Sequence, residues 1–329
     1  MTITEIYQEL ADAPAAAGTM ERRAAPACPL DLFLFVEKPA NRLGFRVRFA
    51  SALLSEEAPL PQFRGLEFSR SRQSGQAVLI LRPTGDAYKD VFTVLVDDIV
   101  THASGQTSEP EAAAALLDRL GRWQTFLQNL RPEGLAPEEQ RGLYGELWFL
   151  RHRLLPHITA DDAVHAWTGT ARTVKDFQFP GGAVEMKTAS ASTDPHLSIN
   201  GARQLDDYGL KILFLAYLAL EPVQGSGETL PIMVAEVRSL IQGSLTARQG
   251  LEDKLREAGY LDVHGPRYER PGYLQHEALV FHVKEGFPRL TEREMPAGVG
   301  DIHYKISVAE CRHHLAADAD VMALVQWQV

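Results

Sequence analysis

The sequence predicts a mixed α/β (α+β) protein in which a β-rich N-terminal region precedes a region where helices and strands alternate. Residues 30–103 contain short apolar runs separated by turn residues, which is typical of antiparallel strands. From Pro137 onward, amphipathic helical patterns alternate with strand-length runs, which indicates a mixed sheet flanked by helices. A chain of 329 residues has room for about two domains. We therefore expect a β-rich domain at 1–105, a connecting helix at 106–136, and a second domain with a C-terminal extension at 137–329.

The composition is that of a folded globular protein, with 45% hydrophobic and 23% charged residues. The strongest apolar run, 212–220, is shorter than the roughly 18 residues of a membrane span. The first ten residues include Glu5 and Glu9 and lack the basic-then-apolar order of a secretion signal. Cys28 and Cys311 provide neither a disulfide framework nor a zinc knuckle. We expect a cytoplasmic protein.

Most elements expected in the first region are strands. Residues 11–29 are rich in Ala and Pro and predict a surface loop or a frayed helix. Four apolar runs within 30–103, the last of them at 91–100, predict strands. Residues 110–130 then predict a helix with one apolar face, made of Leu116, Leu117, Leu120, Trp123 and Leu127.

A helix at 137–155 opens the second region. Pro137 suits the first helical position, and Glu138 and Glu139 suit the positive end of the helix dipole. Its apolar stripe consists of Leu143, Leu147, Leu150 and Leu154. The strands expected after it cover 173–179, 183–189, 211–220, 232–237, 278–284 and 301–308, and the helices cover 200–208, 246–259 and 309–325.

The strands at 173–179 and 183–189 are expected to form a hairpin. Gly181-Gly182 fits a two-residue turn, which would place Asp176 opposite Lys187. Because side chains alternate along a strand, the polar ones would share one face and the apolar ones the other. The polar set is Asp176, Gln178, Glu185 and Lys187, and the apolar set is Phe177, Phe179, Val184 and Met186. A slip of one residue would mix the sets and bury charge, so the pattern predicts two carboxylates and a lysine on one face.

Two carboxylates that converge with a lysine suit metal-assisted hydrolysis of a phosphodiester bond. Carboxylate oxygens are ligands that Mg²⁺ prefers, and the bound cation lowers the pKa of a water and neutralises charge on the phosphate. The lysine can orient that water or stabilise the developing charge. We therefore expect Asp176 and Glu185 to bind Mg²⁺ or Mn²⁺, with the carbonyl of Met186 as a candidate further ligand.

Glu146 is a third candidate carboxylate, on the helix at 137–155. It lies between Leu143 and Leu147, on or beside the apolar stripe, where a carboxylate must be paired or bound to a metal. Gly142 and Gly145 would allow another part of the backbone to approach this helix closely. The alternative is that Glu146 is a surface or salt-bridged residue.

Asp-x8-Glu-x-Lys on a hairpin, preceded by a helix that carries Glu146, resembles the PD-(D/E)XK nuclease superfamily of restriction-endonuclease-like folds. Four segments, Gly-Leu-Tyr-Gly-Glu-Leu-Trp-Phe-Leu, Lys-Asp-Phe, Glu-Met-Lys-Thr and Ala-Arg-Gln-Leu, resemble more narrowly a bacterial family of PD-(D/E)XK-motif proteins associated with phage-defence gene clusters. Phe-Pro-Arg-Leu and Ile-His-Tyr-Lys-Ile-Ser near the end fit the same family. The sequence departs from the superfamily motif at Lys175, where the motif name has proline.

The resemblance implies a restriction-endonuclease-like core of helix, three strands, helix and strand, with 196–199 as the third strand. It also implies that Asp176, Glu185 and Glu146 are metal ligands and that Lys187 is the catalytic lysine. Gln204, in the following helix, stands where related nucleases often place a glutamine near the scissile phosphate. We treat it as an auxiliary catalytic candidate, with a structural hydrogen-bonding role as the alternative.

Two other patterns look like sites but lack the necessary neighbours. Glu252-Asp253-Lys254 is a second Glu-x-Lys, but it lies on a predicted helix without a hairpin partner. His313 and His314 follow Cys311, but adjacent histidines on a helix point to different faces and a fourth zinc ligand is absent. The motif Asp…Glu-x-Lys is itself common on solvated strands, which is the plain alternative to a metal site.

The leading hypothesis is a Mg²⁺-dependent endonuclease that hydrolyses DNA phosphodiester bonds in a bacterial restriction or phage-defence system. The alternative is a catalytically silent DNA-binding or scaffolding subunit of the same fold. All three motif residues, Asp176, Glu185 and Lys187, are present, which favours the enzyme. An RNA-processing nuclease fits the same pattern.

The charge distribution indicates that the chain needs help to hold DNA. The net charge is −10, although residues 140–215 contain eight basic and eight acidic residues. An acidic chain attracts a polyanion weakly, so we expect few phosphate contacts near the motif. The candidates are Arg172, Lys175, Lys187, Arg203 and Lys211. We expect a homodimer, or an operon-encoded ATPase, helicase or methyltransferase, to supply the other contacts.

Overall fold

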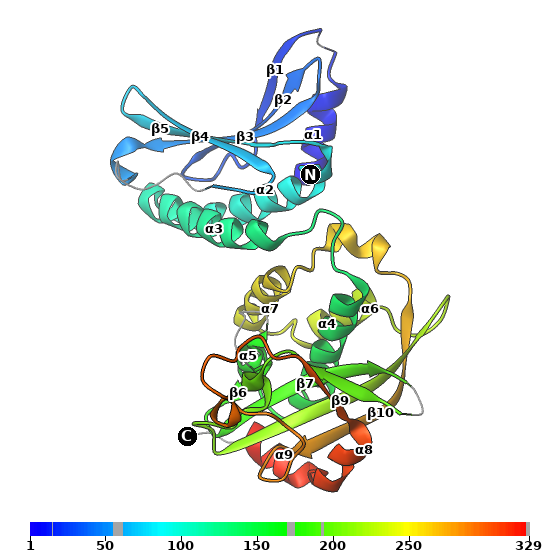
Figure 1. Ribbon diagram of the computed structural model, residues 1–329. Coiled ribbons are helices and arrows are strands. Elements are labelled where there is room, and N and C mark those ends of the chain that lie inside the picture. The colour runs from blue at the N-terminus through cyan, green and yellow to red at the C-terminus, as the bar shows by residue number, and fades with distance from the viewer. Residues whose placement is uncertain (15, 55–61, 170–174, 192–193, 327–329) are drawn as a thin grey trace. The chain divides into compact units, whose positions relative to one another are not determined.

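The computed structural model describes residues 1–14, 16–54, 62–169, 175–191 and 194–326 (Figure 1). The chain divides into two compact units, Met1–Glu133 and Gly134–Val329. The helix expected to connect two domains is α3 (Glu109–Asn129), and it packs against α2 (Lys89–Ser104) inside the first unit. The first unit therefore includes α3, whereas the expected first domain ended at 105 and 106–136 was expected to connect it to a second domain beginning at 137.

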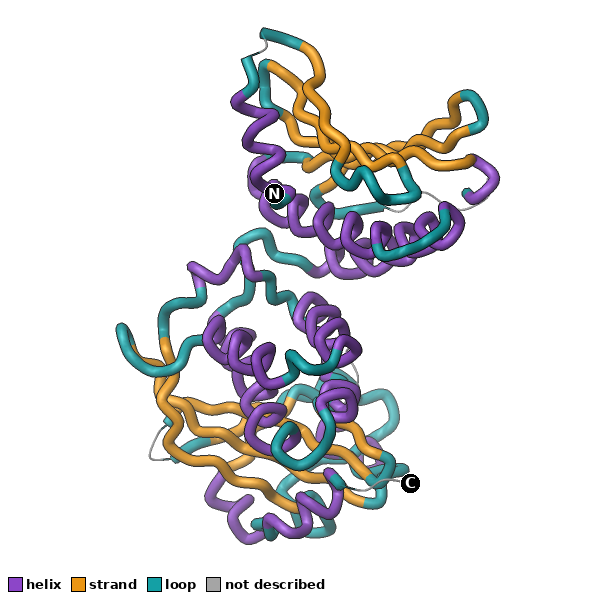
Figure 2. Tube along the Cα trace, turned by 180° about the vertical axis from the view of Figure 1, so that it is seen from behind, coloured by secondary structure: helices purple, strands orange, loops and turns teal. Residues whose placement is uncertain are grey.

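The first unit contains a five-stranded antiparallel sheet with the strand order β1-β2-β3-β5-β4. The strands are β1 (Gly18–Arg23), β2 (Asp31–Lys38), β3 (Arg42–Ala50), β4 (Leu66–Gln73) and β5 (Gln76–Pro83). Helices α2 and α3 lie on one side of this sheet, and α1 (Ile3–Asp12) contacts β2 (Figure 2). The expected loop or frayed helix at 11–29 was wrong, because β1 occupies part of it. This edge strand is mostly exposed and so lacks an alternating pattern.

Residues 91–100 belong to helix α2, so the strand predicted there was wrong. Their β-branched and aromatic side chains favour a strand when the run is read locally. In the structure, Val91, Leu95 and Ile99 recur at helical spacing and are fully buried. Tertiary packing thus outweighs the local strand preference.

A buried ion pair joins α2 to α3. The Arg119 guanidinium donates to both carboxylate oxygens of Asp98, at 2.8 Å each, and the indole N–H of Trp123 donates to the same carboxylate at 2.8 Å. Asp98 and Arg119 are only 7% and 5% exposed. Each charge therefore depends on the other for the interactions that it loses with water.

The second unit contains a four-stranded mixed sheet with the order β10-β9-β7-β6. Its strands are β6 (Phe177–Phe179), β7 (Gly182–Ser190), β9 (Ile212–Val223) and β10 (Gly272–His282), of which β7 and β9 are parallel and the other pairs antiparallel. Five helices contribute to the core on one face: α4 (Pro137–Phe149), α5 (Ala160–Ala166), α6 (Leu230–Leu240), α7 (Leu245–Glu257) and α9 (Asp318–Val325). The expected mixed sheet flanked by helices is confirmed.

Several segments of the second unit differ from the prediction. Residues 232–237, expected as a strand, lie in α6, whose N-terminus is capped by the hydroxyl of Thr229. The expected helix at 309–325 is broken into α8 (Val308–Cys311), a 3-10 turn and α9 (Asp318–Val325). The strand at 196–199 forms as β8 (His196–Ile199). It pairs with β11 (Tyr304–Ser307) in a two-stranded sheet and is not the third strand of the main sheet.

A second core lies on the opposite face of the main sheet. The two-stranded sheet of β8 and β11 contributes to it, together with α8. Leu197, Ile306 and Val308 from these elements pack with Leu213 and Leu215 of β9. The main sheet is therefore covered on both faces, which explains the almost uninterrupted apolar sequence of β9. Among the described helices, we find none that combines the length and apolar character of a membrane span.

We expect the buried pair in the first unit to be far more important to stability than a neighbouring exposed pair. Arg119→Met leaves Asp98 buried without its guanidinium partner, which costs about 3–5 kcal/mol. The matched control is Arg122→Met, because Arg122 pairs with Asp118 on the exposed face of the same helix and contributes about 0.5 kcal/mol or less. Hydrogen exchange of α2 and α3 measures the difference, and equal protection in both variants would contradict it.

Candidate active site

The strands of the motif hairpin pair in a register that is shifted by two residues from the predicted one. Phe177 lies opposite Val184 and Phe179 opposite Gly182, so that Pro180-Gly181 forms the turn. Gly182 belongs to β7, where a Cβ atom would lie 2.1 Å from the carbonyl oxygen of Ile212 in the adjacent β9. Because side chains alternate with a period of two, a shift of two residues leaves every side chain on its predicted face.

The two faces of β7 have different surroundings. Val184 and Met186 belong to the core beneath the helices, whereas Ala183 and Ala189 belong to the core on the other face. Alternation places Glu185 and Lys187 on the same face as these alanines. Asp176 directly precedes β6, at the edge of the sheet, where its Oδ2 accepts a hydrogen bond from the backbone N–H of Met186 at 2.7 Å.

Glu146 reaches this edge from α4, which packs on the opposite face of the sheet. Gly145 allows the close packing, because a Cβ atom there would lie 2.3 Å from the Thr188 side chain of β7. Gly142 has open space around it, so the close backbone approach predicted at this position was wrong. The structure thus brings the side chains of four predicted residues to one place, Glu146, Asp176, Glu185 and Lys187.

Short contacts fix these side chains. The Lys187 ammonium lies 2.7 Å from Oε1 of Glu185, and the Trp167 indole N–H donates to Oε2 of Glu146 at 2.7 Å. Glu185 is 1% exposed, while Glu146, Asp176 and Lys187 keep some exposed surface. Oε2 of Glu185 is buried and has no hydrogen-bond partner among the described residues.

Burial and crowding of like charge raise the pKa values of the carboxyl groups. Burial, and then the negative charge of Asp176, raise the pKa of Glu185 to about 8 and that of Glu146 well above its ordinary value. Burial likewise raises the pKa of Asp176. Burial opposes the charge of Lys187, but the carboxylates of Glu185 and Asp176 outweigh it and raise the pKa of this lysine. Lys187 therefore stays protonated at neutral pH.

The donor set fits a hard divalent cation. Crowded carboxyl groups with raised pKa values gain stability when a cation replaces the missing positive charge, and the free Oε2 of Glu185 is an unused ligand atom. A Cβ on Gly169 would lie 2.7 Å from Oδ1 of Asp176 and 2.9 Å from Oε2 of Glu146, so the glycine keeps space beside both oxygens. As the side chains stand, no three His, Cys, Asp or Glu residues of the described chain form a ready-made metal-binding group.

Lys175 and Gln204 have contacts of another kind. The Lys175 ammonium donates to the carbonyl oxygens of Arg203, Gln204 and Asp206, at 2.6 to 3.0 Å. Oε1 of Gln204 accepts the backbone N–H of Asn200 at 2.9 Å. The helix expected at 200–208 is only the 3-10 helix Ala202–Leu205. The described hydrogen bonds of the Gln204 side chain thus stabilise a turn and do not join it to the carboxylates.

Sequence reasoning missed Trp167, Gly169 and the anchoring role of Lys175. A buried tryptophan must find an acceptor for its N–H, which is a weak signal that does not name the acceptor. The second Glu-x-Lys, at 252–254, lies on α7 as expected. Glu252 pairs with Arg238, and Lys254 donates to backbone carbonyl oxygens near the end of α5.

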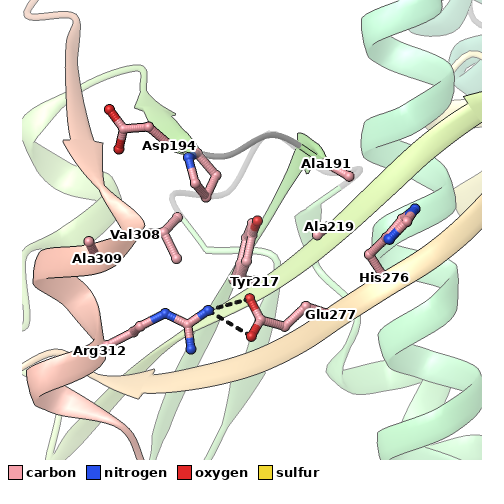
Figure 3. Close-up of a pocket in the computed structure, with 10 residues that line it drawn as sticks. Ala191, Asp194, Tyr217, Ala219, His276, Glu277, Val308, Ala309 and Arg312 are labelled. Atoms are coloured by element: carbon pink, nitrogen blue, oxygen red, sulfur yellow. Dashed lines mark hydrogen bonds and ion pairs between the residues drawn. The ribbon is translucent and has the colours of Figure 1, made fainter.

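A separate pocket of about 280 Å³ is lined in part by β9 and β10 (Figure 3). Its lining residues are Ala191, Asp194, Pro195, Tyr217, Ala219, His276, Glu277, Val308, Ala309 and Arg312. Tyr217 is the register neighbour of Lys187 on β9, and Arg312 pairs with Glu277 at 2.6 and 2.7 Å. None of the predicted site residues lines this pocket, and its Arg312 and Glu277 are paired with each other.

The raised pKa of Glu185 predicts a specific pH dependence of stability. An unfolded glutamate ionises near pH 4.5, but the folded one near pH 8, so ionisation destabilises the cation-free protein progressively between these values. Glu185→Gln removes that titration. The melting temperature of this variant minus that of the unaltered protein should therefore increase from pH 5 to pH 8 in the presence of EDTA. Glu269→Gln, at an exposed position, is the control, and a flat difference for Glu185→Gln would contradict the assignment.

Comparison with known proteins gives a family match over most of the chain. A family model described as "Putative PD-(D/E)XK family member, (DUF4420)" matches residues 3–309, a range that covers nearly all of both structural units. No curated protein and no solved structure matches the chain. The matched range includes Glu146, Asp176, Glu185 and Lys187, and the mixed sheet with flanking helices is compatible with a PD-(D/E)XK fold. The chain belongs to the DUF4420 family of PD-(D/E)XK-type proteins.

Proposed function

We propose that the chain is a Mg²⁺-dependent endonuclease that hydrolyses DNA phosphodiester bonds, in a bacterial restriction or phage-defence system. The observation that carries the proposal is the convergence of Glu146, Asp176 and Glu185 with Lys187 in a chain of the PD-(D/E)XK type. Membership of this family indicates a nuclease. The cation, the DNA substrate and the biological setting are the proposed part.

Three carboxylates would hold the cation, those of Asp176, Glu185 and Glu146, with the carbonyl of Met186 as a further candidate. In an extended strand the N–H and C=O of one residue point to the same side, so the Met186 carbonyl faces the edge where Asp176 accepts its N–H. When bound, Mg²⁺ or Mn²⁺ supplies positive charge to the phosphate and makes a nearby water more acidic.

Lys187 would act directly on the reacting groups. Its ammonium is kept protonated by the neighbouring carboxylates and is oriented by Glu185 at 2.7 Å. A protonated amine with donors to spare can hydrogen-bond the attacking water or an oxygen of the phosphate as negative charge develops there. Burial strengthens this interaction, because little water is present to screen it.

We expect Lys187→Ala to slow DNA cleavage by at least about 100-fold, the loss seen when one such donor is removed. Cleavage of supercoiled plasmid with Mg²⁺ is the measurement, made with the chain alone and with the proteins encoded beside its gene. Lys305→Ala, at an exposed position on β11, is the control and should cleave at the normal rate.

A catalytically silent subunit gives a different result in the same experiment. The unaltered chain would then fail to cleave under every condition while it still responds to Mg²⁺ by a rise in melting temperature. Cleavage of RNA but not of DNA would support the proposed active site and show that the substrate is RNA. Equal cleavage by Lys187→Ala and the unaltered chain would overturn the proposed role of the lysine.

We propose further that DNA binding depends on a second copy of the chain or on an operon-encoded ATPase, helicase or methyltransferase. Lys175 donates to three carbonyl oxygens, Lys187 pairs with Glu185, and Arg203 pairs with Glu292. Three of the five expected phosphate contacts thus have internal partners. Arg172 lies outside the described residues, and Lys211 is exposed.

The isolated chain should therefore bind duplex DNA weakly and with a shallow salt dependence. A small number of phosphate contacts predicts a change of only about tenfold in affinity between 50 and 200 mM salt, against 1,000-fold or more for a self-sufficient DNA-binding protein. Fluorescence anisotropy with a labelled duplex measures this slope. Strong binding with a steep slope, or vigorous cleavage by the chain alone at physiological salt, would show that no partner is required.

A further inference from the structure

Trp167 connects helix α4, which carries Glu146, to strand β6, which begins directly after Asp176. Its side chain is fully buried, and its indole N–H donates to Oε2 of Glu146 at 2.7 Å. Its backbone forms an antiparallel bridge with Phe177, the first residue of β6. One residue thus contacts Glu146 through its side chain and lies beside the strand that begins directly after Asp176.

The next two residues hold Asp176 from the same side. The backbone N–H groups of Thr168 and Gly169 both donate to the carbonyl oxygen of Asp176, at 2.7 and 3.0 Å. The hydroxyl of Thr168 donates to the carbonyl oxygen of Lys175 at 3.0 Å. Residues 167–169 therefore fix the backbone of one candidate ligand and the side chain of another.

Gly169 leaves free the space between the two carboxylates. A Cβ atom at this position would lie 2.7 Å from Oδ1 of Asp176, 2.9 Å from Oε2 of Glu146 and 3.2 Å from the Cα of Asp176. The first two distances are far below normal carbon–oxygen contact. Any larger residue would push the carboxylate oxygens apart or occupy the space that they face.

Lys254, far away in the sequence, anchors this segment. Its ammonium donates to the carbonyl oxygens of Val164 at 2.5 Å and His165 at 3.1 Å, and also to that of Trp167. These are carbonyl groups at the C-terminal end of α5, where a cation also interacts favourably with the helix dipole. The position of the Trp167 backbone is thus fixed from α7, and its indole is fixed on Glu146.

We propose that residues 167–169, held by Lys254, form a positioning element that sets the separation of Glu146 and Asp176 for a divalent cation. Trp167 orients the Glu146 carboxylate, and Gly169 keeps the space between the two carboxylates open. The inference rests on the proposed function, because it takes the cation to be the Mg²⁺ or Mn²⁺ of that proposal. Hydrogen-bond partners of metal ligands commonly change metal affinity by 10- to 100-fold when they are removed.

The experiment is a titration of the full chain with Mg²⁺ or Mn²⁺ alone, in which the melting temperature is measured at each cation concentration. Trp167→Phe keeps an aromatic ring but removes the N–H, and it should raise the cation concentration at half-maximal shift by at least 10-fold. Gly169→Ala should abolish the shift. Asp176→Asn removes a candidate ligand and gives the melting-temperature shift expected when the site is lost.

Matched controls separate positioning from packing. Trp148 is also a buried tryptophan, and its N–H donates to Gln275 at 2.9 Å, away from the carboxylates. Trp148→Phe should lower the starting melting temperature but leave the half-maximal cation concentration unchanged. Gly142→Ala adds a methyl group in open space, so this variant should have the same half-maximal cation concentration as the unaltered chain. Mg²⁺ should also change tryptophan emission in the unaltered chain and in Trp148→Phe, but not in Trp167→Phe.

The outcomes distinguish this inference from the proposed function. If the unaltered chain shows no shift with either cation, the proposed metal chemistry fails and this inference fails with it. If the unaltered chain shows a shift that Asp176→Asn removes, but Trp167→Phe and Gly169→Ala keep an unchanged half-maximal concentration, the metal site stands and the positioning element is refuted. A reduced starting melting temperature alone, equal in Trp167→Phe and Trp148→Phe, also refutes it.

Discussion

The crowding of three carboxyl groups around one partly exposed lysine is the constraint on which the second unit depends. Glu185 is almost wholly removed from water, and its ammonium partner Lys187 compensates only one of its two oxygens. Such an arrangement costs folding free energy, because ionised groups lose hydration that a single ion pair does not restore. The surrounding apolar core, which includes Trp167, Phe177 and Phe214, must supply the stability that keeps these groups together.

The faces of the motif hairpin could be predicted from the sequence, although its turn could not. Phe177 and Val184 share one face in both the predicted and the observed register, because the two differ by an even number of residues. The turn was misplaced because Gly181-Gly182 resembles a common hairpin turn, whereas Gly182 is required for the close approach of β9. Local sequence thus reveals alternation but does not reveal which neighbouring strand makes a glycine necessary.

Contacts between distant residues account for what the sequence did not predict. Trp167 and Glu146 are 21 residues apart, and Lys254 and Trp167 are 87 residues apart. Helix α6 was mistaken for a strand because a short apolar run fits either element, and its capping residue Thr229 lies outside that run. The position of Glu146 beside a leucine stripe did indicate an unusual carboxylate, since a charged group there needs a partner.

The segment 167–169 has a second effect, on association between chains. Strands at the edge of a sheet expose backbone groups that can pair with another molecule. Trp167 bridges Phe177 at the β6 edge, and at the other edge Glu228 bridges Tyr273 and Leu315 bridges Phe281 of β10. Both borders of the main sheet are thus partly occupied by other segments of the same chain. Extension of this sheet by a strand of a second copy is therefore hindered at both of its edges.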